Sequence, residues 1–373
     1  MAIVTTKVKR KYDNMQKIYN KTITELNEDL FKDVINIRNN AFYGCNRLVS
    51  IVIPSSIINL GPSAFRNCTS LTSATLFVNN TSCGTSVFED CSALRSVSVS
   101  DSFTAIPSYF CQNCTSLTSV NLPSGLTSIG GSAFQNTGLT SVNLPSSLMA
   151  ISYSAFQGCT SLASVNLSSS LTSIGSSTFK DCTSLTSISF PSSLTAVNSN
   201  AFENTGLTSV TIPSGMPYNA FSVFRNCKNL KSVTLSGPIG PAWFSGCTSL
   251  EKLTINDANA LTHGGTFGNL TSINDISLVD DIVIPQDCFK GCTGLASIII
   301  PQGASLAAYA FQDCTSLASV TVNDTTPISC TSVTFYNTSP NLVIYVPAES
   351  VEAYKAASGW STYASRIQAI PSE

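Results

Sequence analysis

A motif of about 22 residues recurs along most of the chain, and it constrains the fold more than any other feature. The string Ala-Phe-x-x-Cys-x-x-Leu-x-x-Val-x-Leu-Pro returns with small variations. Its aromatic column has 14 positions with a mean spacing of about 22.5 residues: Phe42, Phe65, Phe88, Cys111, Phe134, Phe156, Phe179, Phe202, Phe224, Phe244, Phe267, Phe289, Phe311 and Phe335. A repeat this short cannot bury its apolar residues alone, so the turns must stack.

One copy of the repeat indicates how each turn is built. In Leu117–Leu122 the last residues alternate between apolar and polar, which is typical of a short strand. Pro123 cannot continue a hydrogen-bonded ladder and ends the strand. A second apolar column lies five residues before the aromatic position, for example at Ile129. The pattern therefore predicts a mainly β solenoid of about 14 parallel-stacked turns of 22–23 residues, with short turns.

The motif resembles the BspA-like class of bacterial leucine-rich repeats over residues 30–347. The carboxyl end is also similar to the usual terminus of that class. Pro347 precedes a short helix that includes Val351 and Tyr354, Gly359 stops it, and Trp360 follows. The resemblance implies a leucine-rich repeat solenoid closed by a C-terminal cap helix. We expect residues 1–21 to be a basic attachment segment or tail, 22–347 the solenoid with 22–40 as an N-terminal half-repeat cap, and 348–373 the C-terminal cap.

Charge is scarce and unevenly distributed. Charged residues make up 11% of the chain and the formal net charge is −2, yet residues 1–21 carry a net charge of +5. The basic residues Lys7, Lys9, Arg10 and Lys11 are candidates for docking to an acidic partner or to a neighbouring subunit, and a solvated tail is the alternative. The remaining body is weakly acidic, which argues against a nucleic-acid partner. We expect no transmembrane segment and no signal peptide in this chain.

Fourteen cysteines raise the question of disulfides. Ten occupy one column, three residues after the aromatic position, and the other four replace core residues: Cys45, Cys68, Cys91, Cys114, Cys159, Cys182, Cys227, Cys247, Cys292 and Cys314, with Cys83, Cys111, Cys288 and Cys330. Thr137 and Thr205 replace cysteine in other repeats, which suits a small packing residue. Stacked turns also keep parallel Cβ atoms about 4.8 Å apart, whereas a disulfide needs about 3.8 Å. We therefore predict free, buried thiols.

Motifs for catalysis, metal or cofactor binding are missing from the sequence. His263 is the only histidine and has no nucleophile motif beside it. The pairs Cys111/Cys114 and Cys288/Cys292 each lack the second pair that a zinc site needs. Five aspartates form either a solvated acidic rim or a calcium-binding edge without the spacing of an EF-hand: Asp257, Asp275, Asp280, Asp281 and Asp287. We expect a protein that is not an enzyme and has no cofactor.

Candidate ligand-binding residues lie on the surface of the repeat. The outward strand positions form a short, uncharged, polar row that includes Asn121, Asn143 and Asn166, and it suits glycans or an extended polymer unless it only fills strands. Irregular repeats add Tyr218, Phe221, Trp243 and His263, unless the aromatic rings fill gaps in irregular packing.

Two functions are compatible with these observations. The first is an adhesion or recognition scaffold that binds a protein or glycan on a cell surface, which the BspA-like resemblance implies. The alternative is a bacteriophage virion protein, tail-associated, that docks on other virion subunits through residues 1–21 and serves a structural or receptor-binding role. Both place the chain outside the cytoplasm, on a cell surface or on a virion.

Overall fold

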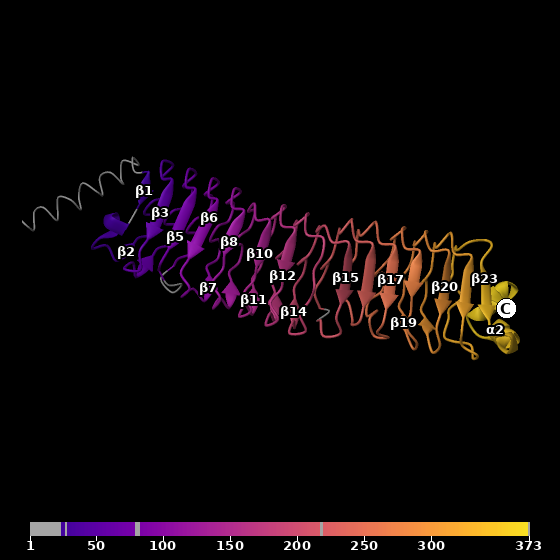
Figure 1. The fold of residues 1–373 in the computed structure, drawn as a ribbon. Helices are drawn as coiled ribbons and strands as arrows, with labels where there is room; N and C mark the ends of the chain where they lie inside the picture. Colours follow the sequence, from indigo (N-terminus) through magenta and orange to yellow (C-terminus); the bar gives the residue numbers. More distant parts are fainter. Residues whose placement is uncertain (1–23, 27, 79–82, 217–218, 372–373) are drawn as a thin grey trace, which may run out of the picture. The chain divides into compact units, whose positions relative to one another are not determined.

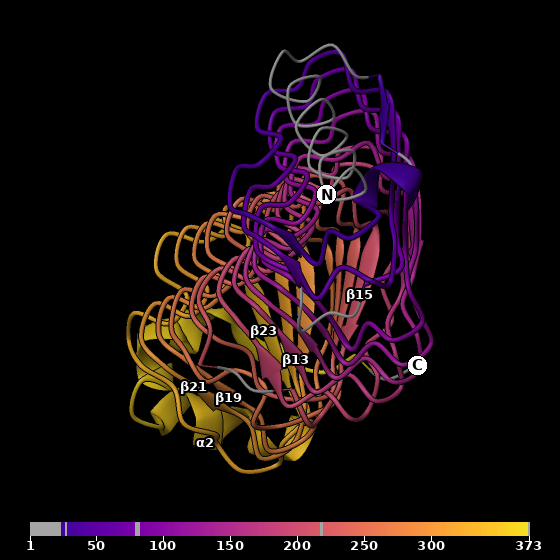
Figure 2. The same ribbon diagram turned by 90° about the vertical axis from the view of Figure 1, so that its left-hand side faces the viewer.

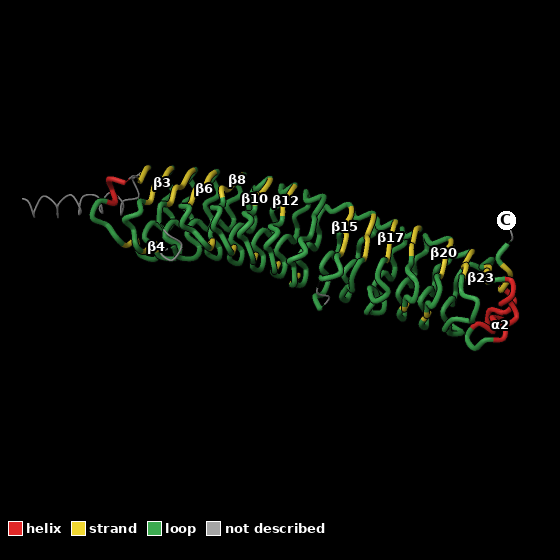
Figure 3. The backbone as a smooth tube through the Cα atoms, turned by 60° about the horizontal axis from the view of Figure 1, so that its bottom comes forward, coloured by secondary structure: helices red, strands yellow, loops and turns green. Residues whose placement is uncertain are grey.

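The computed structural model describes residues 24–26, 28–78, 83–216 and 219–371. The chain divides into two compact units, Met1–Leu185 and Thr186–Glu373. Both units are built from the same coil, in which a strand of three or four residues alternates with a strand of two residues (Figure 1). Loops and tight turns form most of each coil (Figure 3). The predicted leucine-rich repeat solenoid is confirmed, with about 15 turns rather than 14.

The first unit carries two kinds of strand. Its longer strands are β3 (Ser50–Ile53), β5 (Ser73–Leu76), β6 (Ser96–Val99), β8 (Ser119–Asn121), β10 (Ser141–Asn143) and β12 (Ser164–Asn166). Its two-residue strands are β1 (Glu25–Leu26), β2 (Asn36–Ile37), β4 (Asn59–Leu60), β7 (Ala105–Ile106), β9 (Ser128–Ile129), β11 (Ala150–Ile151) and β13 (Ser173–Ile174). All ladders are parallel: β1-β3-β5-β6-β8, β10-β12, β2-β4 and β7-β9-β11-β13. A regular turn therefore adds one strand to each of two parallel ladders, whereas the turn at Cys83 adds only an isolated bridge to Leu60.

The second unit repeats this plan. Its longer strands are β15 (Ser209–Ile212), β16 (Ser232–Leu235), β17 (Lys252–Ile255), β18 (Asp275–Ser277), β20 (Ser297–Ile300), β22 (Ser319–Val322) and β23 (Val343–Val346), and its two-residue strands are β14 (Ala196–Val197), β19 (Val283–Ile284) and β21 (Ser305–Leu306). The parallel ladders are β15-β16-β17-β18, β20-β22-β23 and β19-β21. Within each unit, successive turns appear as loops of similar outline (Figure 2). The described residues 186–190 contain no strand although the repeat predicts one, and the ring of Phe190 packs there against Phe202 at 5.5 Å.

The aromatic column forms the core of both units. Phe42 and Phe65 stack with ring centroids 4.9 Å apart, and Phe156 and Phe179 stack at 5.6 Å. In the second unit Phe311 and Phe335 stack at 5.5 Å. Because the backbone of each turn bonds to the same position of the next turn, the rings meet in register. The sequence column thus predicted the core correctly.

The cysteine column adds sulfur hydrogen bonds between turns. Cys114 Sγ donates to the carbonyl oxygen of Phe88 at 3.0 Å, and eight further thiols of the column bond in the same way to the aromatic residue of the preceding turn. Thr137 occupies the cysteine position of its turn, and its hydroxyl donates to Phe134 O of the same turn at 2.9 Å. A small side chain with one donor therefore fits this column.

The turns before and after the aromatic residue use left-handed backbone. Asp90, Asn113 and Asn136 have φ values of 64°, 60° and 56°. Asparagine and aspartate tolerate this conformation better than other non-glycine residues. Asn113 Nδ2 donates to Asp90 Oδ1, and Asn136 Nδ2 donates to Asn113 Oδ1, both at 2.9 Å. The same residues thus make the turn and join it to its neighbour.

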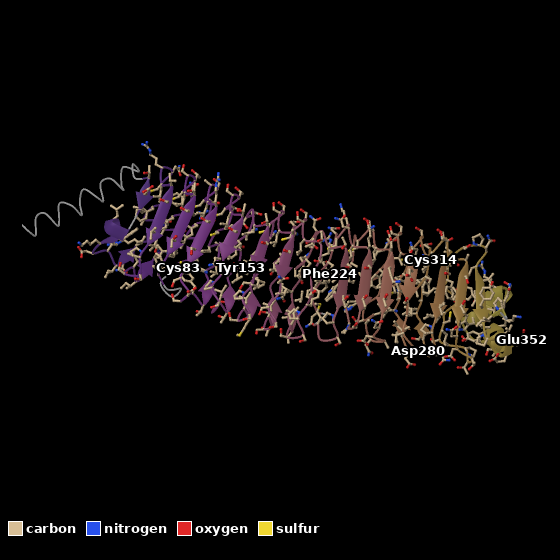
Figure 4. All side chains as sticks on the ribbon, viewed as in Figure 1. Cys83, Tyr153, Phe224, Asp280, Cys314 and Glu352 are labelled. Carbon is tan, nitrogen blue, oxygen red and sulfur yellow. The ribbon has the colours of Figure 1, made fainter. Side chains whose placement is uncertain are left out.

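All fourteen cysteines are free, and Cys45, Cys83 and Cys330 are the partly exposed members; Cys83 and Cys314 are labelled in Figure 4. We expect Ellman's reagent to titrate close to fourteen thiols in denaturant on freshly purified protein, because no pair needs to be bridged to hold the turns. Native protein should react far more slowly, since burial keeps most sulfur atoms from the reagent. A titre in denaturant below about ten thiols would contradict free packing cysteines. A reduced sample, denatured in the same way, serves as the control.

The carboxyl end closes the coil with more structure than one helix. The segments are η3 (Ala348–Ser350), α2 (Val351–Ala356), η4 (Trp360–Arg366) and β24 (Ile367–Ala369). β24 pairs in parallel with β23, which the sequence did not predict. Tyr354 and Trp360 are fully buried, and Trp360 Nε1 donates to Ile328 O at 2.7 Å. These two rings therefore cover the last turn, as a solenoid end requires.

The amino end has a partial turn. β1 pairs with β3, η1 (Glu28–Phe31) follows it, and β2 pairs with β4. Leu26 and Phe31 are buried there. These contacts occur in the segment that we expected to act as a half-repeat cap.

Candidate functional site

The longer strands turn alternate side chains outward and form a polar strand face. In the first unit the outward positions of β10 and β12 are in register, with Ser141 opposite Ser164 and Asn143 opposite Asn166. Ser98 of β6 is likewise opposite Asn121 of β8. All three asparagines are exposed, whereas Val142 and Val165 between the outward positions are buried. The alternation inferred from sequence is therefore the alternation that the structure has.

In the second unit the strand face carries a positive and a negative side chain that neutralise each other. Lys252 and Asp275 lie opposite each other on β17 and β18, and their side chains form an ion pair at 2.8 Å. Thr211 and Thr234 continue the polar row on β15 and β16. A face with hydroxyls, amides and paired charges offers a ligand many hydrogen-bonding groups. Its electrostatic potential is close to neutral, because the charges are paired.

Toward the carboxyl end, the row on the strand face changes character. Ile299, Thr321, Tyr345 and Gln368 occupy successive register positions on β20, β22, β23 and β24. Ile299 has 60% of its surface exposed. Tyr345 and Gln368 were not among the predicted row; Gln368 lies on β24, which is outside the repeat pattern.

Trp243 was a wrong choice as a ligand-binding residue. It stands in the column of small residues just before Phe244 and is fully buried. Its ring packs edge-on against Phe224 at 5.8 Å, and its Nε1 donates to Ala220 O at 2.8 Å. The ring fills the interior of an irregular turn, which is the packing alternative, and it presents no surface to a ligand.

Phe221 and His263 are accessible to different extents. Phe221 has 59% of its surface exposed, and its backbone N–H donates to Ser199 Oγ. His263 is half-buried, and its Nδ1 lies 2.7 Å from Thr262 Oγ1. Tyr218 lies outside the described residues. Binding through these residues stays a prediction.

The five aspartates of the possible calcium edge do not converge. Asp275 pairs with Lys252, and Asp287 lies 3.8 Å from Lys290 Nζ. Asp280 lies near β19 in the second unit and accepts a bond from the backbone of Gln302 (Figure 4). Throughout the described part of the chain, no group of three His, Cys, Asp or Glu residues is arranged to hold a metal ion.

Two tyrosines at turn positions form a side-chain contact that the sequence did not predict. Tyr109 and Tyr153 lie 44 residues apart, yet their hydroxyl oxygens are 2.9 Å from each other. Gly131 lies beneath this pair, because a Cβ there would come within 2.3 Å of the Tyr153 ring. The only signal in the sequence is the recurrence of tyrosine just before or after the aromatic column.

A glutamine ladder lies beside these tyrosines. Gln112 Nε2 donates to Gln135 Oε1 at 2.6 Å, and Gln135 Nε2 donates to Gln157 Oε1 at 3.3 Å. The three side chains occupy one repeat position in successive turns. Repeat proteins commonly use such ladders to hold neighbouring turns together, and the ladder also gives this edge a polar surface.

Comparison with protein families decides which class of solenoid this is. The model of the BspA type leucine rich repeat region matches six copies, over residues 35–163, 149–239 and 222–341. The chain belongs to the BspA-type leucine-rich repeat family. The resemblance inferred from the motif is therefore confirmed, and the matched repeats extend across both units of this BspA-type protein.

A solved structure with a TM-score above 0.5 has the same fold. A leucine-rich repeat protein from Bacteroides ovatus has 24% identity and a TM-score of 0.60, over 91% of this BspA-type chain and 88% of its own. A leucine rich cell surface protein from Faecalibacterium prausnitzii has 24% identity and a TM-score of 0.34, over 87% and 86% of the two chains. At these identities the likeness concerns the fold alone. Comparison with functionally curated proteins gives no significant match.

The basic residues at the start of this BspA-type protein lie outside the described residues, namely Lys7, Lys9, Arg10 and Lys11. Their docking role stays a prediction. Among the helices of the described part, none has the length and apolar character to cross a membrane.

Proposed function

We propose that this BspA-type protein is a recognition scaffold that binds protein or glycan ligands on a cell surface through its strand face. Leucine-rich repeat solenoids are in general binding scaffolds without catalytic chemistry, because stacked repeats make an extended surface for ligands. The observation that carries the proposal is the in-register row of exposed Ser and Asn side chains on β10 and β12.

The spacing of this row favours an extended ligand. Parallel strands repeat about every 4.8 Å, so each turn offers another amide or hydroxyl at a regular interval. Amide side chains donate and accept hydrogen bonds, and hydroxyls do the same. A polymer with polar groups along its length would therefore gain one contact for each turn, and several weak contacts on one chain add to a useful affinity.

The face is less suited to a compact protein partner of the hot-spot type. Its first-unit row of Ser98, Asn121, Asn143 and Asn166 has none of the aromatic or arginine anchors that dominate most protein interfaces. On the strand face of the second unit, Lys252 and Asp275 form an ion pair, and Ile299 and Tyr345 are the large side chains of the row. We therefore place glycans and extended polypeptides ahead of globular protein ligands.

The experiment compares three alanine substitutions on the strand face with two elsewhere. Labelled wild-type protein and the Asn121→Ala/Asn143→Ala/Asn166→Ala variant are applied to a printed glycan array and to cultured epithelial cells. We expect the variant to lose at least about tenfold in retention on the surface that retains wild type, because each lost amide contact is worth about 1 kcal/mol. The control is Ser161→Ala/Ser184→Ala, which removes exposed hydroxyls from turns outside the strand face. Equal retention of all three proteins would refute the strand face as the binding surface.

The virion alternative rests on the charge of residues 1–21, which lie outside the described residues. Docking of this segment on virion subunits stays a prediction from the sequence.

A further inference from the structure

An open cleft lies on the turn side of the second unit, away from the strand face. Its volume is about 610 Å³, within the range of about 300–1,000 Å³ that small-molecule sites occupy. Three successive turns form it, and its polar lining is Gln286, Asp287, Lys290, Tyr309, Gln312 and Tyr336. Apart from Asp287, which was considered only for a calcium edge, none of these residues was a candidate in the sequence analysis.

The repeat arranges this lining in two columns. Asp287 and Tyr309 occupy the left-handed position two residues before the aromatic column, with φ values of 57° and 59°. Lys290, Gln312 and Tyr336 each follow directly after an aromatic-column residue. Successive members of each column are therefore one turn apart, and the cleft lies between the two columns.

The three turns that carry the lining are joined through the core. The rings of Phe289, Phe311 and Phe335 stack at centroid separations of 5.5 Å for each neighbouring pair. Phe289 N–H bonds to Ala310 O, and Phe311 N–H bonds to Thr334 O. The backbone positions from which the lining side chains extend are therefore fixed relative to one another.

The charges of the lining cancel. Asp287 accepts a hydrogen bond from Gln286 Nε2 at 3.0 Å and lies 3.8 Å from Lys290 Nζ. These are the two charged groups of the lining. An anionic or cationic ligand would therefore meet an already compensated pair, and a neutral ligand would not have to break it.

Main-chain groups of the rim are used within the fold. The backbone N–H groups of Lys290, Gln312 and Tyr336 donate to carbonyl oxygens of their own turns. An extended peptide binds best where a strand edge leaves such groups unpaired. Recognition in this cleft must instead come from side chains: two phenol rings, two carboxamides, one carboxylate and one ammonium group.

We propose that this cleft binds an uncharged oligosaccharide, independently of the strand face. Tyr336 has 57% of its surface exposed and offers a ring face against which the C–H side of a sugar ring can pack. Sugar hydroxyls donate and accept hydrogen bonds, as the amides of Gln286 and Gln312 do. The open shape fits one or two residues of a longer chain that continues into solvent.

The test uses a panel of uncharged hexasaccharides: maltohexaose, cellohexaose, xylohexaose and mannohexaose. Each is titrated into the 373-residue protein by calorimetry and by saturation-transfer NMR, at low and at high salt. We expect at least one to bind, with an affinity that changes less than twofold with salt, because the ligand carries no charge to screen. Tyr336→Ala and Gln312→Ala should each weaken that affinity by at least about tenfold, because each removes a direct contact.

Tyr43 supplies the matched control. It occupies the same repeat position as Tyr336 and has 48% of its surface exposed, but it lies in the first unit. Tyr43→Ala should leave the affinity unchanged, and so should the asparagine variant of the strand face, which separates this proposal from the proposed function. The cleft proposal is overturned if no hexasaccharide binds, if Tyr336→Ala binds as well as wild type, or if the affinity falls steeply with salt. It is also overturned if the panel fails and an acidic or basic peptide binds at Tyr336.

Discussion

Raising the pH from about 8 to about 10 should strongly destabilise this protein, because most of its buried thiols hold their protons only in the folded state. Burial raises the pKa of the Cys159 thiol to about 11 and that of the Cys314 thiol to about 12, from an ordinary value of 9.0. The pKa is raised in ten thiols altogether: Cys83, Cys91, Cys114, Cys159, Cys182, Cys247, Cys288, Cys292, Cys314 and Cys330. In Cys91 and Cys247 a hydrogen bond with a neighbouring thiol is the largest cause and burial is the second. The contact with Cys247 in turn lowers the pKa of the Cys227 thiol, which opposes the effect at this pair.

The sign follows from proton binding. Above about pH 9 the unfolded chain releases its thiol protons while the folded chain still holds them, so the folded state binds more protons and the free energy of unfolding falls as the pH rises. Each thiol contributes about 1.4 kcal/mol per pH unit until its folded pKa is reached. The contributions of the buried thiols add, so the free energy of unfolding should fall steeply above about pH 9.

Urea unfolding followed by circular dichroism at several pH values between about 7 and 10 measures this loss. The matched variant is Cys159→Thr/Cys182→Thr, since threonine already occupies the same column at Thr137 and Thr205. It should unfold at a higher pH than wild type, because two fewer thiols ionise on unfolding. A urea midpoint that stays constant from about pH 8 to about pH 10 would contradict the explanation.

Trp360→Ala should destabilise the carboxyl-terminal turns by about 3–5 kcal/mol. The ring is fully buried, packs edge-on against Tyr354 at 5.1 Å and lies 6.2 Å from Phe335. Its removal leaves a cavity and also leaves Ile328 O without the bond from Trp360 Nε1. A solenoid turn is held only by its neighbours, so the opened end should fray first.

Hydrogen exchange followed by mass spectrometry locates the effect. Protection should fall in β22 and β23 and stay unchanged in the first unit. Trp360→Phe, which keeps a ring but loses the N–H donor, should lie between wild type and Trp360→Ala. Phe221→Ala is the surface control, because that ring is 59% exposed and its loss should change stability by less than about 0.5 kcal/mol. Uniform loss of protection along the whole chain would argue against a local cap.

Function could be predicted from the sequence only as a class. The repeat identified a BspA-type leucine-rich repeat scaffold, which the family match confirms and which is compatible with a recognition role. The individual site residues were less predictable, because the regular repeat says where a side chain leaves the backbone but not what it meets. Trp243 is the clearest case: an aromatic residue in an irregular segment suggested an exposed anchor, and the ring is buried against Phe224.

The sequence by itself determined the core of this protein. A period of 22–23 residues decides which side chains face inward, so the aromatic, leucine and cysteine columns follow from the order of amino acids alone. Only the tertiary structure decided what happens on the turn side. Stacking brings Tyr109 and Tyr153 together across Gly131, and it places Tyr309 and Tyr336 around one cleft. The reason is physical: inward positions are fixed by burial, which the pattern of apolar residues records, whereas contacts between surface side chains depend on left-handed turns and on neighbours one or two turns away, which the pattern does not record.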